Sequence, residues 1–418
     1  MGKEVEDLTQ QKQRRRPMSR EEALARQERQ RLRKEKEQES RELARGPIDL
    51  PFCLLVLLLT AVGLVMLLSA SFPSAYYETK NNDPMYYFTR QGVFAIMGVA
   101  AMFFISKINY QRFRAFAKPL LYIAIILLVL VLIPGIGQTR NNATRWIGVG
   151  DLFTFQPSEI AKLAIIVFFA DSISKKKNLM ESFRYGVRPY ILTLAFFAGL
   201  MLLEPHLSGT ILIVGTGVVM MIVGGIDKRW AIGGLGGVAV LGFAYVKLVE
   251  AGVISYGADR IRMWEDPWID ALDEGYQMCQ SLIAIGSGGL TGVGLGKGRQ
   301  KFLYLPEEHN DFIFAVVCEE LGLIGAALVM LIFALLILRG FWIALQARDR
   351  FGALLVVGIM TQISLQTFLN IAVVSGLVPA TGISLPFFSY GGTALALQLF
   401  EMGIVLSVSR QIPAPRGG

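Results

Sequence analysis

The chain has 418 residues, of which 53% are hydrophobic and only 18% are charged. This balance excludes an ordinary soluble globular protein of the same length and favours a membrane protein. The net charge of +8 comes mainly from a basic N-terminal tail and from short segments between apolar blocks. The charge therefore indicates membrane topology, and no nucleic acid partner is expected.

Cysteines and histidines are too few to build a covalent or metal-based framework. The three cysteines, Cys53, Cys279 and Cys318, show no CxxC pairing, which excludes a disulfide scaffold and a zinc signature. Only two histidines, His206 and His309, are present, so a histidine-built metal cluster is excluded as well. The fold must therefore depend on helix packing.

Residues 1–47 form a charged N-terminal segment. They mix basic and acidic side chains and contain almost nothing apolar to bury, so we expect a disordered cytoplasmic tail. Its basic residues would help to fix the orientation of the chain or would rest on anionic lipid headgroups. A signal peptide is not expected, because the first apolar stretch follows this polar tail and is too long for the apolar region of such a peptide.

Apolar blocks of about 20 residues follow the tail, and a helix of that length crosses about 30 Å of hydrocarbon. The sequence predicts ten spans, at residues 50–72, 88–105, 116–133, 158–172, 189–203, 207–225, 230–249, 312–338, 351–375 and 393–408. The predicted fold class is all-α, a polytopic membrane protein with about ten transmembrane helices. Because ten is an even number, both termini are predicted on the same side of the membrane.

The connections between these spans alternate in character. One set is basic, for example at Lys107, Lys175 and Arg350, and is predicted to be cytoplasmic by the positive-inside rule. The other set includes a long extracytoplasmic loop at 250–311, between helices 7 and 8, and function is expected on this face because loops of that length are usually functional. The predicted organisation is a cytoplasmic tail at 1–47, a ten-span domain at 48–409 and a short cytoplasmic tail at 410–418.

A glycine-rich segment at 286–298 invites comparison with a phosphate-binding loop. Its register excludes a Walker loop, because the required glycine and hydroxyl residue are missing from their positions and no strand precedes it. Its glycines are expected to provide tight turns beside a lipid pyrophosphate. Lys297, Arg299 and Lys301 are candidate anion contacts.

Two charged residues stand at the start of the span predicted at 158–172. Glu159 follows a Pro-Ser pair, and Lys162 lies three residues later, so the two side chains share a helix face and can pair. A charged pair that enters a span usually faces a cavity and not lipid. A structural ion pair that stabilises the helix entrance is an equally open interpretation.

Asp311 ends the long outer loop where the span at 312–338 begins. The partial positive charge of a helix N-terminus favours an ionised carboxylate there, so on local chemistry Asp311 is a helix cap or a functional group. About two turns deeper, Glu319 and Glu320 cannot both face lipid at low cost, and at least one is expected to point into a polar interior.

The connection at 376–392 is rich in proline, glycine and hydroxyl residues and includes Ser389. Non-helical backbone near membrane depth is tolerated only if it is buried in protein or lines a cavity. This segment is therefore either a re-entrant wall of a cavity or an ordinary tight outer loop.

Together these segments resemble the SEDS family (shape, elongation, division and sporulation), the membrane glycosyltransferases that include FtsW, RodA and SpoVE. The resemblance covers nearly all of residues 50–410. Its marks, in chain order, are Arg145-Trp146-Ile147, Gln156-Pro157-Ser158-Glu159 with Lys162, Gly275-Tyr276-Gln277 with Gln280-Ser281, Leu305 to Phe314 followed by Glu319-Glu320-Leu321-Gly322, and Pro386 to Gly392. Tyr276-Gln277 and Gln300-Lys301 look more like the FtsW and SpoVE branch than the elongation branch.

The resemblance implies a peptidoglycan glycosyltransferase that polymerises lipid II at the outer face of the bacterial cytoplasmic membrane, in cell division. The family's essential aspartate corresponds to Asp311, which would act as the base that accepts a proton from a sugar hydroxyl or as a ligand of a divalent cation, Mg or Mn. Arg145 is a candidate contact of the pyrophosphate. Glu159 and Lys162 match positions that support the cavity, and Ser389 lies in the outer loop of the family pattern.

The resemblance also implies partners. They are lipid II, a class B penicillin-binding protein that would cross-link the strands, and other division or elongation proteins, while no organic cofactor is expected. One departure from the family pattern is the sequence Glu204-Pro205-His206, where the family commonly has a Pro-Asp pair. No role of that aspartate is transferred to His206, which is expected to be an interfacial residue or to titrate near neutral pH.

Two other functions are open from the sequence. Intramembrane charges would suit a flippase or transporter of a lipid-linked precursor; they are Glu159, Lys162, Glu319, Glu320 and Glu401. A scaffold without enzymatic activity would recruit other wall enzymes through its charged tail.

Overall fold

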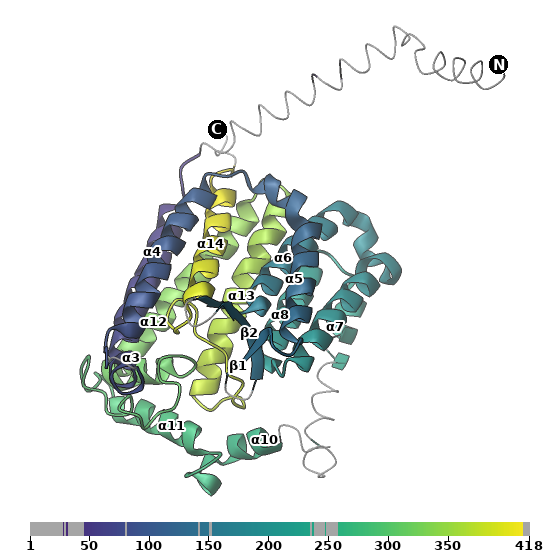
Figure 1. Ribbon diagram of the computed structural model, residues 1–418. Coiled ribbons are helices and arrows are strands. Elements are labelled where there is room, and N and C mark those ends of the chain that lie inside the picture. Colours follow the sequence, from purple (N-terminus) through teal and green to yellow (C-terminus); the bar gives the residue numbers. More distant parts are fainter. Residues whose placement is uncertain are drawn as a thin grey trace, which may run out of the picture.

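The computed structural model describes residues 28, 31, 46–79, 82–140, 143–149, 153–234, 236–237, 247 and 258–412. In this part of the chain, nine helices lie side by side in one bundle (Figure 1). They are α3 (Leu50–Glu78), α4 (Tyr86–Ser106), α5 (Phe113–Val131), α6 (Pro157–Lys176), α7 (Arg188–Leu203), α8 (Leu207–Val223), α12 (Ile313–Gln346), α13 (Arg350–Val374) and α14 (Gly392–Ser409). Two short helices, α10 (Ala258–Glu265) and α11 (Tyr276–Gly288), lie across the end of the bundle farthest from the chain termini (Figure 1).

The predicted class, an all-α polytopic membrane protein, is confirmed. Among the described residues, seven helices are long and apolar enough to cross a membrane. They are α3, α4, α12, α13 and α14, together with α5 and α7, each of which is extended by the short turn of helix before it. Helix α8 is shorter but apolar, and α6 carries charged residues near both of its ends.

Several predictions fall on residues that the structure does not describe. The span predicted at 230–249 lies largely outside the described residues, so the count of ten stays a prediction. The charged tail at 1–47 also lies outside them, apart from four positions, as does the start of the loop predicted at 250–311.

A small antiparallel sheet between α5 and α6 is a feature that the sequence analysis did not predict. Its strands, in spatial order, are β1 (Gly137–Arg140), β2 (Ala143–Val149) and β3 (Phe153–Phe155). Gln138 pairs with Trp146, and Gly148 pairs with Thr154. Threonine, tryptophan, isoleucine and phenylalanine all favour strands, and this segment is too short and polar to span a membrane. The sheet carries Arg145 to the site described below.

Small residues let α4 and α14 approach closely. A Cβ atom added at Gly98 would lie 2.6 Å from the side chain of Leu399, and one at Gly403 would lie 2.7 Å from the carbonyl oxygen of Met102. Such contacts are typical of helix packing in membranes, where association depends on close van der Waals contact. The position of α14 against α4 is therefore fixed by these two glycines, which matters because α14 begins at the candidate site.

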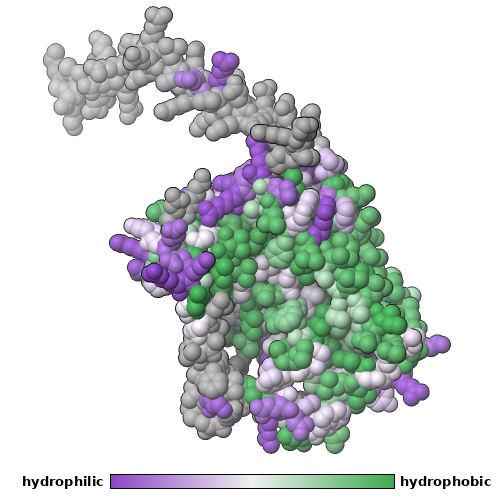
Figure 2. All heavy atoms as spheres, turned by 180° about the vertical axis from the view of Figure 1, so that it is seen from behind, coloured by the Kyte–Doolittle hydropathy of each residue, from purple (hydrophilic) through white to green (hydrophobic). Residues whose placement is uncertain are grey.

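Both described ends of the chain lie at one end of the bundle (Figure 1). The guanidinium of Arg410 donates to the carbonyl oxygen of Gly46 (2.8 Å), and the amide of Asp49 donates to the hydroxyl of Ser409 (3.4 Å). Figure 2 shows hydrophobic residues over the side of the bundle and hydrophilic residues gathered toward its two ends. This is the surface expected of a protein whose sides face hydrocarbon.

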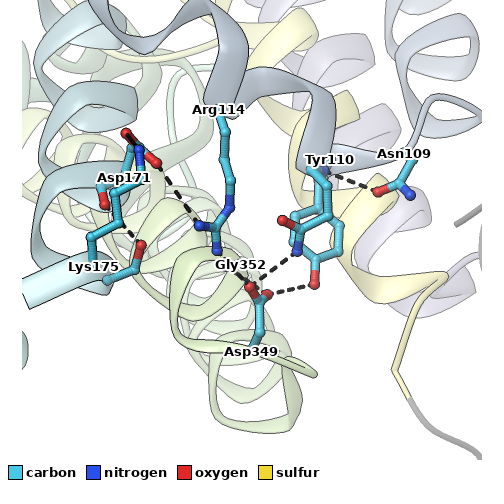
Figure 3. A network of polar contacts seen from close by, with 9 residues as sticks. Asn109, Tyr110, Arg114, Asp171, Lys175, Asp349 and Gly352 are labelled. Carbon is cyan, nitrogen blue, oxygen red and sulfur yellow. Dashed lines mark hydrogen bonds and ion pairs between the residues drawn. The ribbon is translucent and has the colours of Figure 1, made fainter. Parts of the chain in front are cut away.

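Asp349 organises the polar contacts at this end of the bundle (Figure 3). It accepts hydrogen bonds from Tyr110 (2.6 Å), Gln111 (3.0 Å) and Arg114 (2.9 Å), and from the amide of Gly352 (3.1 Å). Burial alone would raise the pKa of Asp349, but these hydrogen bonds and the charge of Arg114 hold the pKa below its ordinary value. The carboxylate thus joins α5 to the start of α13.

We expect Asp349→Ala to lower the free energy of unfolding by on the order of 2 kcal/mol or more, because hydrogen bonds to a charged group each contribute about 1.5–3 kcal/mol. Since the pKa is depressed in the folded protein, this contribution is present above the ordinary aspartate pKa and is lost as the pH falls through the folded value. Thermal melting of the purified protein at several pH values measures both effects. Glu181→Ala, at an exposed acid of the same end, is the control and should melt like the wild type.

Candidate active site

The residues at the end of the bundle opposite the described chain ends line a cavity of about 1280 Å³. It is lined by the ends of α3 and α4 that meet there, by β2, by the starts of α6 and α8, by the segment before α12 and by the loop between α13 and α14. This volume exceeds the 300–1,000 Å³ that is common for drug-sized ligands. The cavity therefore has room for a ligand larger than a typical drug-sized molecule.

Asp311 lines this cavity just before α12 begins. Its backbone is fixed by Asn370 of α13, whose amide donates to the carbonyl oxygens of Asp311 (2.7 Å) and of Ile383 (2.6 Å). Gly382 lies close to the carboxylate: with φ of +69°, it has no Cβ, and an added Cβ would stand 3.2 Å from Oδ2 of Asp311. Asn370 thus fixes the backbone of Asp311, and the missing side chain at Gly382 leaves room for its carboxylate.

The pKa of Asp311 is raised to about 6, first by burial and then by the negative charge of Glu307, while Arg145 and His309 oppose the shift. A carboxylate with such a pKa is still mostly ionised at neutral pH, and it accepts a proton more readily than an ordinary aspartate. This is the range in which a side chain is an efficient general base.

Arg145 of β2 also lines the cavity, and its guanidinium is held at the start of α8. It donates to the carbonyl oxygens of Pro205 and of Glu204, the latter at 3.4 Å. The side chain of Glu204 is buried, and neither of its carboxylate oxygens has a partner among the described residues. Burial raises the pKa of Glu204 to about 8, against the opposing charge of Arg145, so this acid is mostly neutral at pH 7.

His206 lies at the same corner of the cavity, beside Gln156. The Nε2 atoms of the two side chains are 3.2 Å apart. Burial, followed by the charges of Arg145 and Lys162, lowers the pKa of His206 to about 3. The alternative in which His206 titrates near neutral pH is therefore wrong, because the ring is only 8% exposed and lies near two cations.

Glu159 and Lys162 form an ion pair of 2.8 Å, and both residues line the cavity. Helix α13 carries the polar residues Gln362, Gln366 and Asn370. Their spacing of four residues places all three on one helix face. Gln362 donates to Glu401 of α14 (3.3 Å). The sequence analysis did not single out this stripe, although polar residues four apart in an apolar span are a signal that a helix faces a polar interior.

Lys297 and Lys301 do not line the cavity. Lys297 is exposed, whereas Lys301 is buried, with its Nζ 2.7 Å from Glu320 and 2.9 Å from the hydroxyl of Ser69. The structure thus differs from the sequence interpretation, in which these lysines contact a lipid pyrophosphate.

The glycine-rich segment holds anions that belong to the chain itself. Backbone amides of Gly296 (3.0 Å) and Gly298 (3.4 Å) donate to Glu320, and the amide of Arg299 donates to Glu319 (2.7 Å). The glycines are needed because the backbones approach closely: a Cβ at Gly292 would lie 2.1 Å from the carbonyl oxygen of Glu320. The expectation that Glu319 or Glu320 points into a polar interior holds for both carboxylates.

Ser389 is also absent from the lining and instead fixes the loop that carries it. Its hydroxyl donates to the carbonyl oxygen of Asn310 (2.7 Å) and accepts from the amide of Leu385 (2.7 Å). Gln91 of α4 holds the same loop from the other side, since it donates to the carbonyl oxygen of Ser389 (3.1 Å) and accepts from the amide of Gly391 (3.1 Å). The loop is a wall of the cavity, as one of the two sequence interpretations expected.

No group of three or more histidine, cysteine or acidic residues suited to a metal ion is found within the described residues. Asp311 and Glu307 both line the cavity, and the charge of Glu307 acts on Asp311. Mg²⁺ is commonly held by one or two carboxylates together with substrate phosphates. The donor set therefore fits a divalent cation that binds together with a phosphate-bearing substrate.

Comparisons with known proteins agree on one family. Residues 50–413 match the family model for FtsW, RodA and SpoVE, described as cell cycle proteins. "Stage V sporulation protein E" of Bacillus subtilis is 46% identical over 363 residues, which cover 87% of this chain and 97% of that protein. "Probable peptidoglycan glycosyltransferase FtsW" of Geobacter metallireducens is 41% identical over 364 residues, which cover 87% of this chain and 95% of that protein.

Solved structures show the same fold. A chain from a study of the structural coordination of polymerization and crosslinking by a peptidoglycan synthase complex matches with a TM-score of 0.72 and 28% identity, covering 87% of this chain and 98% of that one. The crystal structure of the rod shape determining protein RodA of Thermus thermophilus matches with a TM-score of 0.64 and 27% identity, covering 88% of this chain and 99% of that one.

Proposed function

The chain belongs to the family of cell cycle proteins formed by FtsW, RodA and SpoVE, and we propose on this premise that it is a peptidoglycan glycosyltransferase that polymerises lipid II. The observation that carries the proposal is a carboxylate of raised pKa, Asp311, in a large polar cavity that also presents Arg145 and Lys162. A base and a cationic surface are the two functions that this glycosyl transfer requires.

Asp311 and the two cations, Arg145 and Lys162, have different roles in the reaction. Asp311 takes the proton of the acceptor's sugar 4-hydroxyl while that oxygen attacks the anomeric carbon of the donor. The new glycosidic bond forms as the bond from this carbon to the pyrophosphate oxygen breaks, and the undecaprenyl pyrophosphate leaves with the bonding electrons. Arg145 and Lys162 stabilise its negative charge. In the alternative role, Asp311 together with Glu307 would hold a divalent cation, Mg or Mn, which would neutralise charge on the leaving group when bound.

The orientation follows from charge. Basic residues gather at the end of the bundle that holds both described chain ends; they include Lys107, Arg114, Lys175, Arg339 and Arg410. By the positive-inside rule, this distribution supports an orientation with this end in the cytoplasm and the cavity outside it. We propose accordingly that residues 1–47 and 410–418 are cytoplasmic tails of a domain at 48–409 in the bacterial inner membrane.

The proposed partners are a class B penicillin-binding protein and other division proteins. The similarity to a chain of a peptidoglycan synthase complex supports a cross-linking partner. The relatives named FtsW support a role in cell division.

Purified protein mixed with lipid II in detergent tests the proposal, with and without added Mg²⁺ or Mn²⁺. We expect glycan strands that are digested by a muramidase. A lipid flippase, which the stripe of polar residues on α13 would also suit, would instead transfer labelled lipid II between the leaflets of vesicles and make no polymer. Translocation without polymer would contradict the proposed enzyme.

A further inference from the structure

Three aromatic rings form a separate part of the cavity lining. Tyr87 of α4 stacks on His309, with ring centroids 4.5 Å apart and planes inclined by 27°. Tyr390, from the loop between α13 and α14, meets Tyr87 edge-on at 4.8 Å. All three residues line the cavity, although they come from distant parts of the sequence. We call Tyr87, His309 and Tyr390 the aromatic platform.

The platform is held in place by polar contacts. The amide of Tyr390 donates to the carbonyl oxygen of His309 (2.9 Å), and Nδ1 of His309 lies 3.4 Å from the carboxylate of Glu308. Glu308 is fixed in turn by the hydroxyl of Ser74. The hydroxyl of Tyr87 donates to Glu78 (3.3 Å). The rings are therefore positioned before any ligand binds, which lowers the entropic cost of binding.

The charges around the platform differ from those near Arg145. The segments that carry the platform bring acidic residues to the cavity; these are Glu78, Asp83, Glu307 and Glu308. Arg90 is the cation of the same region and lies over the ring of Tyr86, 4.5 Å from its centroid. Such a surface repels a pyrophosphate. It suits a neutral sugar, whose apolar face packs on an aromatic ring while its hydroxyls donate to carboxylates.

Asp311 lines the same cavity as Arg145 and the aromatic platform. The charges of both Arg145 and His309 act on its carboxylate, and Asp311 follows His309 by two residues in the chain. A base in this reaction must reach the acceptor hydroxyl and must also lie beside the anomeric carbon that carries the pyrophosphate. The presence of Arg145, Asp311 and the aromatic platform in one cavity is consistent with that requirement.

We propose that the aromatic platform is the subsite for the acceptor sugar, a neutral N-acetylhexosamine ring that presents its hydroxyl to Asp311, while Arg145 and Lys162 hold the donor's pyrophosphate. This subsite rests on the proposed function, because it divides the same cavity between the two substrates. It assigns Tyr87 and Tyr390 as substrate-binding residues that contact sugar and take no part in proton transfer.

Tyr87→Leu and Tyr390→Leu test the subsite, since leucine keeps apolar volume but removes the planar ring. A ring that binds the ground state and the transition state equally changes KM and not kcat. We expect KM for lipid II to rise on the order of tenfold in each leucine variant, with kcat nearly unchanged. Tyr87→Phe and Tyr390→Phe should retain the wild-type KM, because the ring remains. Tyr77→Leu, at an exposed tyrosine outside the cavity lining, is the control.

A binding measurement separates this subsite from the proposed function. The probe is a chitin tetrasaccharide, which has N-acetylhexosamine rings but no pyrophosphate and no lipid. Its contacts with the purified protein are followed by saturation-transfer NMR. We expect binding to wild type and to Asp311→Asn, and loss of binding in Tyr87→Leu at an unchanged melting temperature.

Equal binding of the tetrasaccharide to wild type and Tyr87→Leu would overturn the subsite, even in a protein that polymerises lipid II. If Tyr87→Leu lowered the melting temperature, its loss of binding could come from partial unfolding. The results for Tyr390→Leu and Tyr87→Phe would then decide whether the subsite exists. If KM stayed at the wild-type value in Tyr390→Leu, the proposal would be wrong.

Discussion

Asp311→Asn is expected to lower the rate of lipid II polymerisation by roughly 10²–10⁴-fold, the usual contribution of a positioned general base. Asparagine has nearly the same shape as aspartate but cannot accept a proton. The hydrogen bonds that Asn370 makes to backbone carbonyls of this region do not involve the replaced group. The rate of polymer formation in purified protein measures the effect, and Asp273→Asn, at an exposed aspartate outside the cavity lining, is the matched control.

The pH dependence of the wild type follows from the same carboxylate. Only the ionised form accepts a proton, so kcat/KM should fall as the pH is lowered through about 6, the pKa of Asp311. An ordinary aspartate would give this decline near its usual pKa of 3.8. A profile that stays flat down to pH 5 would show that another group is the base.

The stability of Asp311→Asn provides a further check. Because the pKa of Asp311 is raised in the folded protein, the folded state loses stability as the pH rises from the ordinary value to the folded one. Removal of the ionisable group should therefore leave the melting temperature at pH 7 unchanged or higher. An inactive variant that melts at a lower temperature would point to a structural role for Asp311 and not to catalysis.

Glu320→Gln is expected to cause the largest loss of stability, about 3–5 kcal/mol, because it leaves the buried ammonium of Lys301 without its counter-charge. The side chain of Lys301 is 3% exposed, so water cannot replace the lost carboxylate. Lys301→Met combined with Glu320→Gln removes both charges and should recover part of the loss, as a coupled pair requires.

Lys297→Met is the control for this double-mutant cycle of Lys301 and Glu320, since Lys297 belongs to the same glycine-rich segment but is exposed. Its effect should stay within about 0.5 kcal/mol. Thermal melting of the wild type, Glu320→Gln, Lys301→Met and the double variant in one detergent gives the coupling energy. If the double variant were no more stable than Glu320→Gln alone, the pair would not be coupled and the account of the glycine-rich segment would be wrong.

The fold class could be predicted because a helix needs about 20 apolar residues to cross a membrane, and that length is visible in one sequence. The sheet that carries Arg145 was missed, since its strands are short and its segment has no strong alternation. Tertiary context decides such elements more than local preference does.

The candidate site could be predicted in part. Asp311, Arg145, Glu159 and Lys162 share one cavity. Asp311, Glu159 and Lys162 stand at helix starts that the sequence marks, whereas Arg145 was named only through the family resemblance. The role of Lys301 could not be predicted, because its buried partner, Glu320, lies 19 residues away. The spacing does not show whether such a lysine pairs with a carboxylate of the protein or contacts a substrate.

Gln91 and His206 could not have been assigned from the sequence. The amide of Gln91 fixes a loop almost 300 residues away, a contact that exists only in the folded bundle. For His206 the sequence left two interpretations open, an interfacial residue or a group that titrates near neutral pH, and only its burial near Arg145 and Lys162 argues against the second.

The wall beside Asp311 has no regular secondary structure between Val374 and Gly392, and its shape is imposed from outside. Gln91 donates a hydrogen bond to one side of this loop, and the carbonyl oxygen of Asn310 accepts one from Ser389. Helix α3 packs so closely against the loop that a Cβ at Gly63 would lie 2.2 Å from the carbonyl oxygen of Phe387. No excised fragment of the chain can therefore reproduce this surface. A minimal catalytic version of the protein would have to retain α3 as well as α14.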